Sequence, residues 1–452
     1  MAEIKELEMI HIPEGAERSG GQSCNYWFFG YLPQGLLDFI DSHRNFVDVR
    51  YDPLTGHEVQ CPHNKASIWT SIDDAIYNQP RGSLKSRKLP AVSMTFKSCF
   101  NDHSAQAEHI GCLVAMALDQ PTSYNFIVKF DPDKHRRITD NYPTPSKIKN
   151  VRPYGIVSVD FLQLKKGQQH KSTSSYHDKD GKYHEIESIS DYTGDELISF
   201  EQIFKENPTI AISKMSGDEN LMENWIYGVD EYVKKELKGC PREFINKEIT
   251  KIHSRMARSF LLRELLGDSD FASYNSGLVF NRATKRLRYA PEHDFGAAFN
   301  GLIQNKLKKI DPYFGFTKEK YDALPETMKQ TLAMSTARKS RPIPDIAKDW
   351  ASASGEENFH YVLNNFPNAS REFFENLDTA VMKGELENII DTVGKMTCNG
   401  KPLLTKKECE MFKEYILCRA AHLTEKYIEH LKSNNMPIFT PHNADPNSFT
   451  FE

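Results

Sequence analysis

Hydrophobic residues in the first 165 positions fall into short runs that are typical of strands. Between the second and third run, the Ala-rich stretch 104–118 carries apolar residues at helical spacing, with Ser104 as a candidate N-cap. The pattern therefore predicts a small sheet with one helix. The predicted strands are runs of β-branched and aromatic residues bounded by turn formers, at residues 26–29, 92–96, 126–130 and 155–161.

The remainder of the chain has mostly helical periodicity. Residues 165–193 are polar and predict a mobile loop or insertion, and the Pro/Asn-rich residues 437–452 predict a tail. One apolar face is formed by Ile245, Ile249, Ile252, Met256 and Phe260, which are three or four residues apart. Further helices are predicted at 318–335, 343–367, 369–394 and 404–433.

Composition excludes several classes of protein. Of the 452 residues, 39% are hydrophobic and 11% aromatic, which supplies a sizeable core and excludes a wholly disordered chain. The net charge of −5 argues against a protein that coats nucleic acid, and we expect no direct nucleic-acid binding. The mean hydropathy is −0.58, and no run approaches the ~18 apolar residues of a membrane span.

Localisation is predicted from the N-terminus and the cysteines. The N-terminus is charged and lacks the apolar run of a secretory signal. Eight cysteines occur without a Cys-x-x-Cys pair, which favours free thiols in a reducing compartment over a disulfide framework. We therefore expect a cytoplasmic protein.

The segment 261–299 carries the strongest chemical signal. A helix is predicted to end at Gly267, and a polar loop and a short hairpin then lead to a second acidic position. Phosphoryl transfer needs a carboxylate that accepts the proton of the attacking hydroxyl, and oxygen ligands that hold Mg²⁺ against ATP. The spacing assigns the first role to Asp270 and the metal to Asn275 and Asp294. ATP and Mg²⁺ are thus the expected cofactors.

This segment resembles the HipA-like kinases, bacterial Ser/Thr kinases of the protein-kinase and lipid-kinase fold. The family's catalytic loop has Gly, then Asp three residues later, then Asn five further on, as at Gly267, Asp270 and Asn275. Its metal-binding Asp follows a Pro by three positions, as Asp294 follows Pro291, and Asp-Phe-Gly also occurs in protein kinases. The family often has His after the catalytic Asp, where this chain has Phe-Ala.

The resemblance and the pattern together predict an α+β, two-lobed protein-kinase-like fold. The expected N-lobe spans 1–162, is β-rich with one helix, and contains an insertion at about 32–90. The expected C-lobe spans 163–436 and is mostly helical.

A kinase N-lobe needs a strand lysine that holds phosphate and a helix glutamate that pairs with it. Lys97 ends the second predicted strand, and Glu108 lies eleven residues later in the predicted helix. Lys129 is the rival, but no Glu-bearing helix follows it.

The resemblance also implies a nucleotide site. Ser-Gly-small-Gln is the core of the family's phosphate loop, here Ser19, Gly20, Gly21 and Gln22, and Ser23 adds a second hydroxyl. The strand that ends in Asp-Phe resembles the family's approach to the hinge. Val159 and Phe161 would then meet the adenine.

Three weaker signals lie outside this constellation. His57, Cys61 and His63 lack a second zinc half-site and indicate a surface loop. The basic residues between 81 and 88 indicate a solvated loop that could contact an acidic or phosphorylated partner. The hydroxyl-rich residues 171–176 are a candidate autophosphorylation segment.

These features predict a kinase that phosphorylates a Ser/Thr hydroxyl of a protein substrate. If it is a toxin or an effector, an antitoxin or a host target would be its partner, and an effector would act in a host cytosol. Two alternatives stay open: a lipid or small-molecule kinase of the same fold, and a nucleotide-binding pseudokinase scaffold.

Overall fold

The computed structural model describes most of the chain, and every structural statement below concerns these residues. They are 5–10, 12, 17–19, 25–30, 50–51, 58–59, 92–98, 103–131, 152–159, 170–177, 183–190, 195–205, 222–270, 275–281, 285–307, 323–329 and 341–437. Most of the predicted insertion, the tail after residue 437 and most of the predicted helix 318–335 lie outside them.

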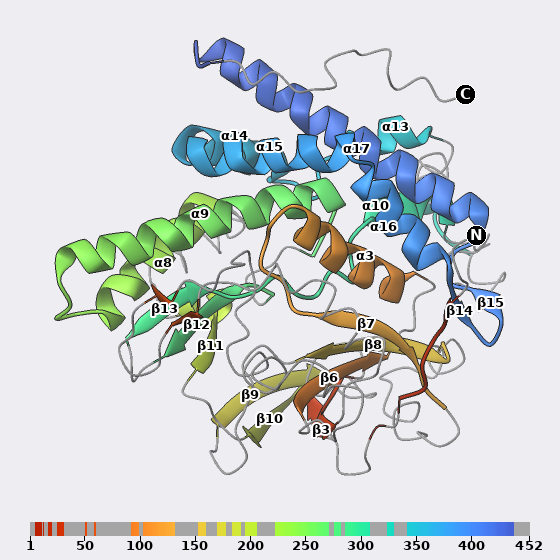
Figure 1. The fold of residues 1–452 in the computed structure, drawn as a ribbon, viewed down its shortest axis with the longest axis horizontal. Helices are drawn as coiled ribbons and strands as arrows, with labels where there is room; N and C mark the ends of the chain where they lie inside the picture. The colour runs from red at the N-terminus through yellow and green to blue at the C-terminus, as the bar shows by residue number, and fades with distance from the viewer. Residues whose placement is uncertain are drawn as a thin grey trace.

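A five-stranded antiparallel sheet forms one side of the molecule (Figure 1). The four predicted strands are confirmed within a few residues, and a short strand from the start of the chain extends the sheet. Phe96, Ile127 and Val157 are buried in its core. The strand order is β2 (Glu17–Ser19), β3 (Asn25–Gly30), β6 (Val92–Ser98), β8 (Tyr154–Val159) and β7 (Asn125–Lys129).

Helix α3 (Ser104–Ala117) packs against this sheet. Every residue from 105 to 116 is buried, because the sheet lies on one side and α16 (Glu385–Gly394) packs on the other (Figure 1). The predicted N-cap was wrong. The capping residue is His103, which makes no side-chain cap bond, and its imidazole Nε2 instead lies 3.0 Å from Glu408 Oε1.

Helices form the other side of the molecule. The predicted helix around 245–260 is α9 (Arg242–Leu266), and the predicted helix 404–433 is α17 (Lys406–Ser433). The other helices in the described residues include α6 (Phe200–Lys205), α8 (Met222–Glu236), α10 (Asn300–Leu302), α13 (Ile343–Ile346), α14 (Gly355–Asn365) and α15 (Pro367–Met382), with a π-helical turn at Ile303–Leu307.

Two predicted helices are each divided in the structure. The stretch 343–367 forms α13 and α14, and α14 ends before Pro367, which occupies the first turn of α15. The stretch 369–394 is divided at Gly384, which has φ of 64° and separates α15 from α16. Helices and strands are thus mixed as the α+β prediction required.

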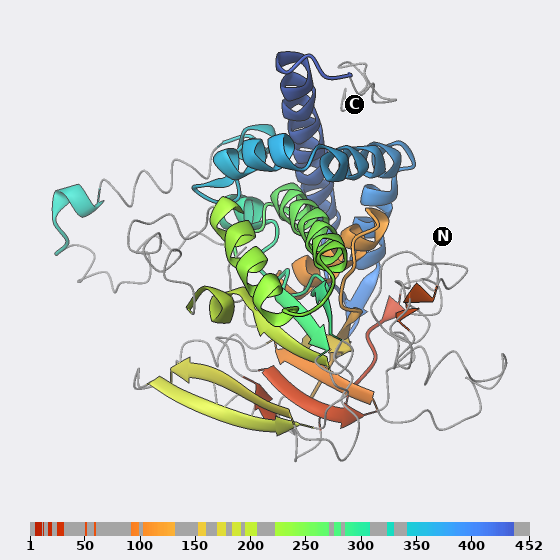
Figure 2. The same cartoon turned by 90° about the vertical axis from the view of Figure 1, so that its left-hand side faces the viewer.

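The polar stretch 165–193 corrects the sequence analysis. It was expected to be a loop, but it contains the antiparallel strands β9 (His170–His177) and β10 (Tyr183–Ser190), paired over eight residues each (Figure 2). Both runs contain β-formers, and Asp180-Gly181 lies between them in the sequence. An Asp-Gly pair between two strand-like runs indicates a β-hairpin. The sequence analysis missed this hairpin because the residues around the pair are polar.

A second small sheet joins the start of the described chain to a hairpin near residue 400. Strand β1 (Lys5–Glu6) pairs in parallel with β14 (Met396–Cys398), which forms a hairpin with β15 (Lys401–Pro402). The Glu6 carboxylate accepts hydrogen bonds from Lys129 Nζ at 2.8 Å, Thr397 Oγ1 at 2.7 Å and the Asn399 N–H at 2.8 Å.

The remaining strands form two further sheets. The predicted hairpin is confirmed as β12 (Gly277–Asn281) and β13 (Arg286–Tyr289), and β11 (Asp195–Ser199) adds a third strand that was not predicted. Strands β4 (Arg50–Tyr51) and β5 (Glu58–Val59) pair within the predicted insertion. No helix in the described ranges has both the length and the apolar character needed to cross a membrane.

Candidate active site

Lys97 lies near the end of β6, and its ammonium group pairs with two carboxylates from distant parts of the chain. Nζ lies 3.4 Å from Glu108 Oε2 of α3 and forms a second ion pair with Asp294 Oδ1, which follows β13. These partners are eleven and 197 residues away in sequence. The fold therefore brings together three of the residues that the sequence analysis selected.

The sheet register brings the start of the predicted phosphate loop to Lys97. Ser19 of β2 pairs with Asn25 of β3, and Asn25 pairs with Lys97 of β6. The two residues that flank the segment 20–24 thus share one row of the sheet with the lysine. Gly20, Gly21, Gln22 and Ser23 themselves lie outside the described residues.

Glu108 is held in the middle of α3, where only 4% of the residue is exposed. Burial raises the pKa of this carboxyl above its usual value, and the Lys97 ammonium opposes that rise. Asn125 Nδ2 donates to the Glu108 backbone carbonyl at 3.3 Å, which ties this turn of the helix to β7. A buried carboxylate beside a lysine is the arrangement that fixes the lysine's position.

The Asp294-Phe295-Gly296 tripeptide packs directly against α3. A side-chain Cβ at Gly111 would lie 2.6 Å from Phe295 Cβ, so the helix can approach the fully buried phenylalanine only because residue 111 is glycine. A Cβ at Gly296 would lie 3.1 Å from Lys97 Nζ. Asp294 itself has φ of 59°, a left-handed conformation that Asp tolerates better than most residues.

The electrostatics of Asp294 depend on Lys97. Burial alone would raise the pKa of this carboxyl, but the neighbouring Lys97 ammonium outweighs burial and lowers the pKa to about 2. The carboxylate is therefore ionised at neutral pH. Its side chain keeps 38% exposure, so it is open to a ligand from solvent.

Arg263, in the last turn of α9, was missed by the sequence analysis. Its guanidinium pairs with Asp268 and lies 3.2 Å from Glu292 Oε2. It also donates to the backbone carbonyls of His293 at 2.7 Å and Asp294 at 3.3 Å. The side chain is 1% exposed and lies 4.8 Å from the centre of the Phe295 ring. One buried cation thus connects the loop after α9 with the loop after β13.

The loop after α9 orders Asp270 and Asn275. The helix ends at Gly267, which has φ of 59° as the predicted helix end requires. The Asp270 N–H then donates to Asp268 Oδ1 at 3.0 Å, and Asn275 Nδ2 donates to the Asp270 carbonyl at 3.1 Å. Asp268 is the partner of Arg263, so the same guanidinium supports Asp270 and the backbone of Asp294.

The chemistry of the Asn275 and Asp294 side chains fits Mg²⁺. A carboxylate and a carboxamide oxygen are hard ligands, and Mg²⁺ commonly takes one or two protein ligands beside phosphates and water. Among the described residues, no group of three or more His, Cys, Asp or Glu side chains is arranged to hold a metal ion.

Several predicted site residues lie at the edge of the described residues or outside them. Val159 ends β8, and Phe161 lies outside the described residues, as do residues 271–274 of the polar loop. The zinc-like residues His57, Cys61 and His63 and the basic positions at 81–88 also lie outside. Lys129, the rival lysine, pairs with Glu6 and not with an acidic residue of α3.

Solved structures include remote likenesses to this chain. No family model matches the sequence, and no curated protein matches it. The Helicobacter pylori proinflammatory kinase CtkA aligns with a TM-score of 0.38 and 11% identity, over 76% of this chain and 89% of that one. The Shewanella oneidensis toxin–antitoxin complex of HipA, HipB and operator DNA aligns with a TM-score of 0.34 and 10% identity. The alignment covers 77% of this chain and 62% of that chain. Similarity at this level establishes neither family nor activity.

Proposed function

We propose that this protein is an ATP- and Mg²⁺-dependent kinase that transfers the γ-phosphate to a Ser/Thr hydroxyl of a protein. The observation that carries the proposal is the double ion pair of Lys97 with Glu108 and Asp294. In protein kinases, a strand lysine paired with a helix glutamate and an Asp-Phe-Gly aspartate that holds Mg²⁺ must both be in place for phosphoryl transfer.

Each side chain has a distinct role in this proposal. Lys97 holds the phosphates of ATP, and Glu108 fixes the direction of the lysine. Asp270 orients the acceptor hydroxyl and takes its proton. Asn275 and Asp294 hold Mg²⁺, which when bound neutralises charge on the transferred phosphoryl group. Ser19 and the segment that follows it support the phosphates from β2, which β3 separates from the Lys97 strand.

The test compares transfer with nucleotide binding. We expect Asp270→Asn to abolish transfer of radiolabelled γ-phosphate to proteins of a cell lysate, because an amide cannot accept the proton. Binding of Mg-ATP, measured by calorimetry, should persist in that variant. Asp294→Ala should weaken Mg-ATP binding as well, because a metal ligand is removed.

The same measurements distinguish the alternatives. A pseudokinase scaffold would bind nucleotide and never transfer phosphate, and a lipid or small-molecule kinase would label lipid or small-molecule fractions instead of protein. Turnover of Asp270→Asn at the parental rate would refute the mechanism.

A further inference from the structure

One face of α17 contacts the chain beside each of the three elements that carry candidate site residues. The face is a single stripe along the helix, formed by residues four, three and four positions apart: Glu408, Phe412, Tyr415 and Arg419. The last three are buried, with at most 2% of each residue exposed. None of the four belongs to the proposed kinase machinery, so their contacts are considered in turn from the end of the stripe to its start.

The far end of this face holds the last turn of α9. Arg419 Nε donates to the Glu264 backbone carbonyl at 2.6 Å, and its guanidinium also pairs with the Glu264 carboxylate at 3.2 Å. Tyr415 packs on Gly267, where a side-chain Cβ would clash with the tyrosine hydroxyl. Gly267 precedes Asp270 by three positions, so α17 fixes the point at which the loop after α9 begins.

The middle of the face holds the segment that follows Asp-Phe-Gly. The centre of the Phe299 ring lies 4.9 Å from that of Phe412 and 5.9 Å from that of Tyr415. The Phe299 N–H also donates to the carbonyl of Leu266, the last residue of α9, at 2.7 Å. Phe299 lies five positions after Asp294, and α17 therefore supports the loop that carries the proposed metal ligand.

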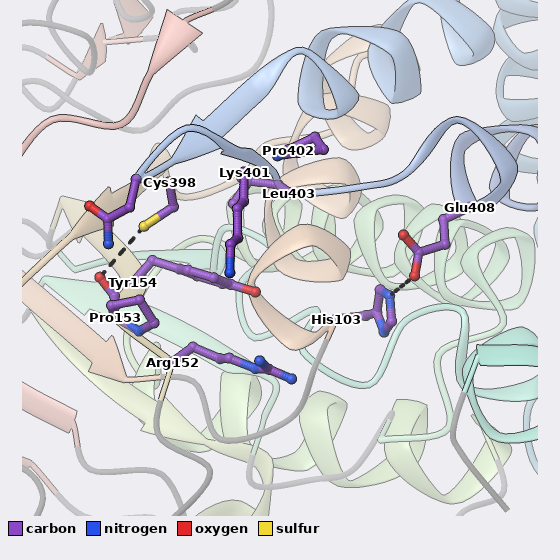
Figure 3. Close-up of a pocket in the computed structure, with 10 residues that line it drawn as sticks. His103, Arg152, Pro153, Tyr154, Cys398, Lys401, Pro402, Leu403 and Glu408 are labelled. Carbon is purple, nitrogen blue, oxygen red and sulfur yellow. Dashed lines mark hydrogen bonds and ion pairs between the residues drawn. The ribbon is translucent and has the colours of Figure 1, made fainter.

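The first turn of α17 holds the start of α3. Figure 3 shows the side chain of His103, the residue before α3, in contact with the Glu408 carboxylate. His103 Nε2 lies 3.0 Å from Glu408 Oε1, and the imidazole centre lies 6.2 Å from that of the Phe412 ring. A carboxylate only accepts hydrogen bonds, so His103 Nε2 carries the proton of this contact. Glu108 lies five residues after His103, little more than one helical turn.

The two oxygens of Glu408 have different partners. Oε2 accepts from the Thr405 N–H at 2.7 Å in the capping box that stabilises the start of α17, and Oε1 contacts His103. Burial would raise the pKa of Glu408, but the Thr405 and His103 contacts lower it. A cavity of about 390 Å³ adjoins the His103–Glu408 contact (Figure 3). Removing the imidazole thus enlarges an existing space and opens no closed void, so it should cost little stability.

We propose that His103 is a positioning residue for phosphate transfer. Through Glu408 it holds the start of α3, and with it Glu108, in place relative to α17. Because the same face of α17 holds the loops of Asp270 and Asp294, this contact sets the position of the lysine–glutamate pair relative to both loops. His103 touches none of the reacting groups. The role rests on the proposed kinase function, since it concerns the geometry of that site.

The test separates the rate of transfer from the binding of nucleotide. We expect His103→Ala to lower γ-phosphate transfer at saturating Mg-ATP about tenfold, because small misplacements of a reacting group are costly even when they arise far from the chemistry. Mg-ATP affinity should change less than about twofold, since Lys97 keeps its ion pair with Asp294. His103→Gln should recover most of the rate, because its amide can donate to Glu408 from nearly the position of the imidazole Nε2.

Thr405→Ala is the matched control. It removes the hydroxyl that accepts from the Glu408 N–H in the capping box, and it leaves the His103–Glu408 contact in place. It should lower the urea midpoint of unfolding at least as much as His103→Ala does, with transfer close to the parental rate. Equal losses of transfer in Thr405→Ala and His103→Ala would show that the stability of α17 controls the rate, and the proposal would be wrong.

Pulse labelling of lysines with acetic anhydride, read by peptide mass spectrometry, tests the positioning without a transfer reaction. Only the neutral amine reacts, and the two carboxylates beside Lys97 favour its charged form. We expect His103→Ala to raise the labelling of Lys97 about threefold relative to Lys129, which pairs with Glu6 and serves as internal reference.

Unchanged Lys97 labelling in His103→Ala would overturn the proposal, and so would parental transfer by that variant. A parent chain that transfers no phosphate would refute the proposed kinase function. The labelling ratio would then decide by itself whether His103 positions the lysine–glutamate pair.

Discussion

At the scale of single residues, the two lysines that compete for the phosphate-binding role have different surroundings. Lys97 contacts two carboxylates of the candidate site, whereas Lys129 pairs with Glu6 beside the β1–β14 sheet. We expect Lys97→Met to reduce γ-phosphate transfer about a hundredfold to a thousandfold, the usual cost of removing one preorganised electrostatic group.

Lys129→Met serves as the control in the same radiolabel assay, because it removes an equivalent lysine from another strand of the same sheet. It should retain transfer close to the parental rate. Equal losses of transfer activity in the two variants would show that the substitutions disturb the sheet and do not act through the candidate site.

The pH dependence of stability gives a second prediction for Lys97. In the parent, the folded pKa of Asp294 is about 2 against a usual 3.8, so its stabilising contribution is complete above about pH 4 and is lost as the pH falls toward 2. Without Lys97, burial remains and raises the folded pKa of both Asp294 and Glu108. A carboxyl whose folded pKa lies above its unfolded pKa loses stability as the pH rises through the folded pKa. We therefore expect Lys97→Met to lower the free energy of unfolding more at pH 7 than at pH 5.

Urea unfolding of the parent and the variant at the two pH values measures this difference. Lys129→Met is again the control. Its partner Glu6 has a pKa of about 2, and the hydrogen bond from Lys129 is the largest cause of that lowering. Because Glu6 is solvent-exposed, its pKa in the variant would return toward the usual 4.5. Its effect should be nearly the same at pH 5 and pH 7. A Lys97→Met effect that does not change with pH would mean that the two carboxyls do not need a nearby cation.

At the scale of elements, the approach of α3 to the Asp-Phe-Gly loop depends on one missing side chain. Gly111→Ala would place a methyl group 2.6 Å from Phe295 Cβ, and neither atom lies at the end of a flexible side chain. The helix must shift, and with it Glu108. We expect a loss of about 1–3 kcal/mol in the free energy of unfolding and about a hundredfold in transfer rate.

Chemical denaturation and the radiolabel assay measure these two effects. Ala117→Ser adds one atom at a half-buried position near the end of the same helix and should change neither value appreciably. Parental activity in Gly111→Ala would show that the position of α3 does not control the lysine–glutamate pair.

The elements also show what a single sequence can reveal. The four sheet strands, α3, α9 and the β12–β13 hairpin have strong local periodicity and clear turn residues, and each was predicted. Strand β11 was missed because its stability comes from pairing with β12, some 80 residues later in the chain, as its register shows. The β9–β10 hairpin was missed because its residues are polar.

In the candidate site, too, the residues with a local sequence pattern were predicted, and the residue whose contacts come from distant parts of the chain was missed. Asp270, Asn275 and Asp294 were found because their spacing along the chain is informative, and Lys97 and Glu108 because of their order. Arg263 has no such spacing. Its importance appears only when the fold brings Asp268, Glu292 and two backbone carbonyls around one guanidinium. An arginine in the last turn of a helix, among Leu261, Leu262, Leu265 and Leu266, was the one available signal.

At the scale of the whole molecule, the C-terminal part of the chain is needed by the N-terminal sheet and its helix. Helix α16 packs on α3, and Gln106 Nε2 donates to the Leu403 carbonyl at 2.9 Å. Strand β1 pairs with β14, and Glu6 bonds to residues 397–400. The β-rich part thus completes its packing with residues that lie more than 230 positions later in the sequence.

A fragment of residues 1–162, the predicted N-lobe, should therefore not fold by itself. It would expose the apolar face of α3 that α16 covers, and it would lack the partners of β1. We expect no cooperative urea transition and strong aggregation, whereas a chain ending at residue 437 should unfold as the full chain does, because it keeps every described element. Circular dichroism across the transition and light scattering measure both properties. A sharp transition in the 1–162 fragment would show instead that the sheet and α3 form an independent unit, and that the contacts of α16, β14 and Leu403 only dock it.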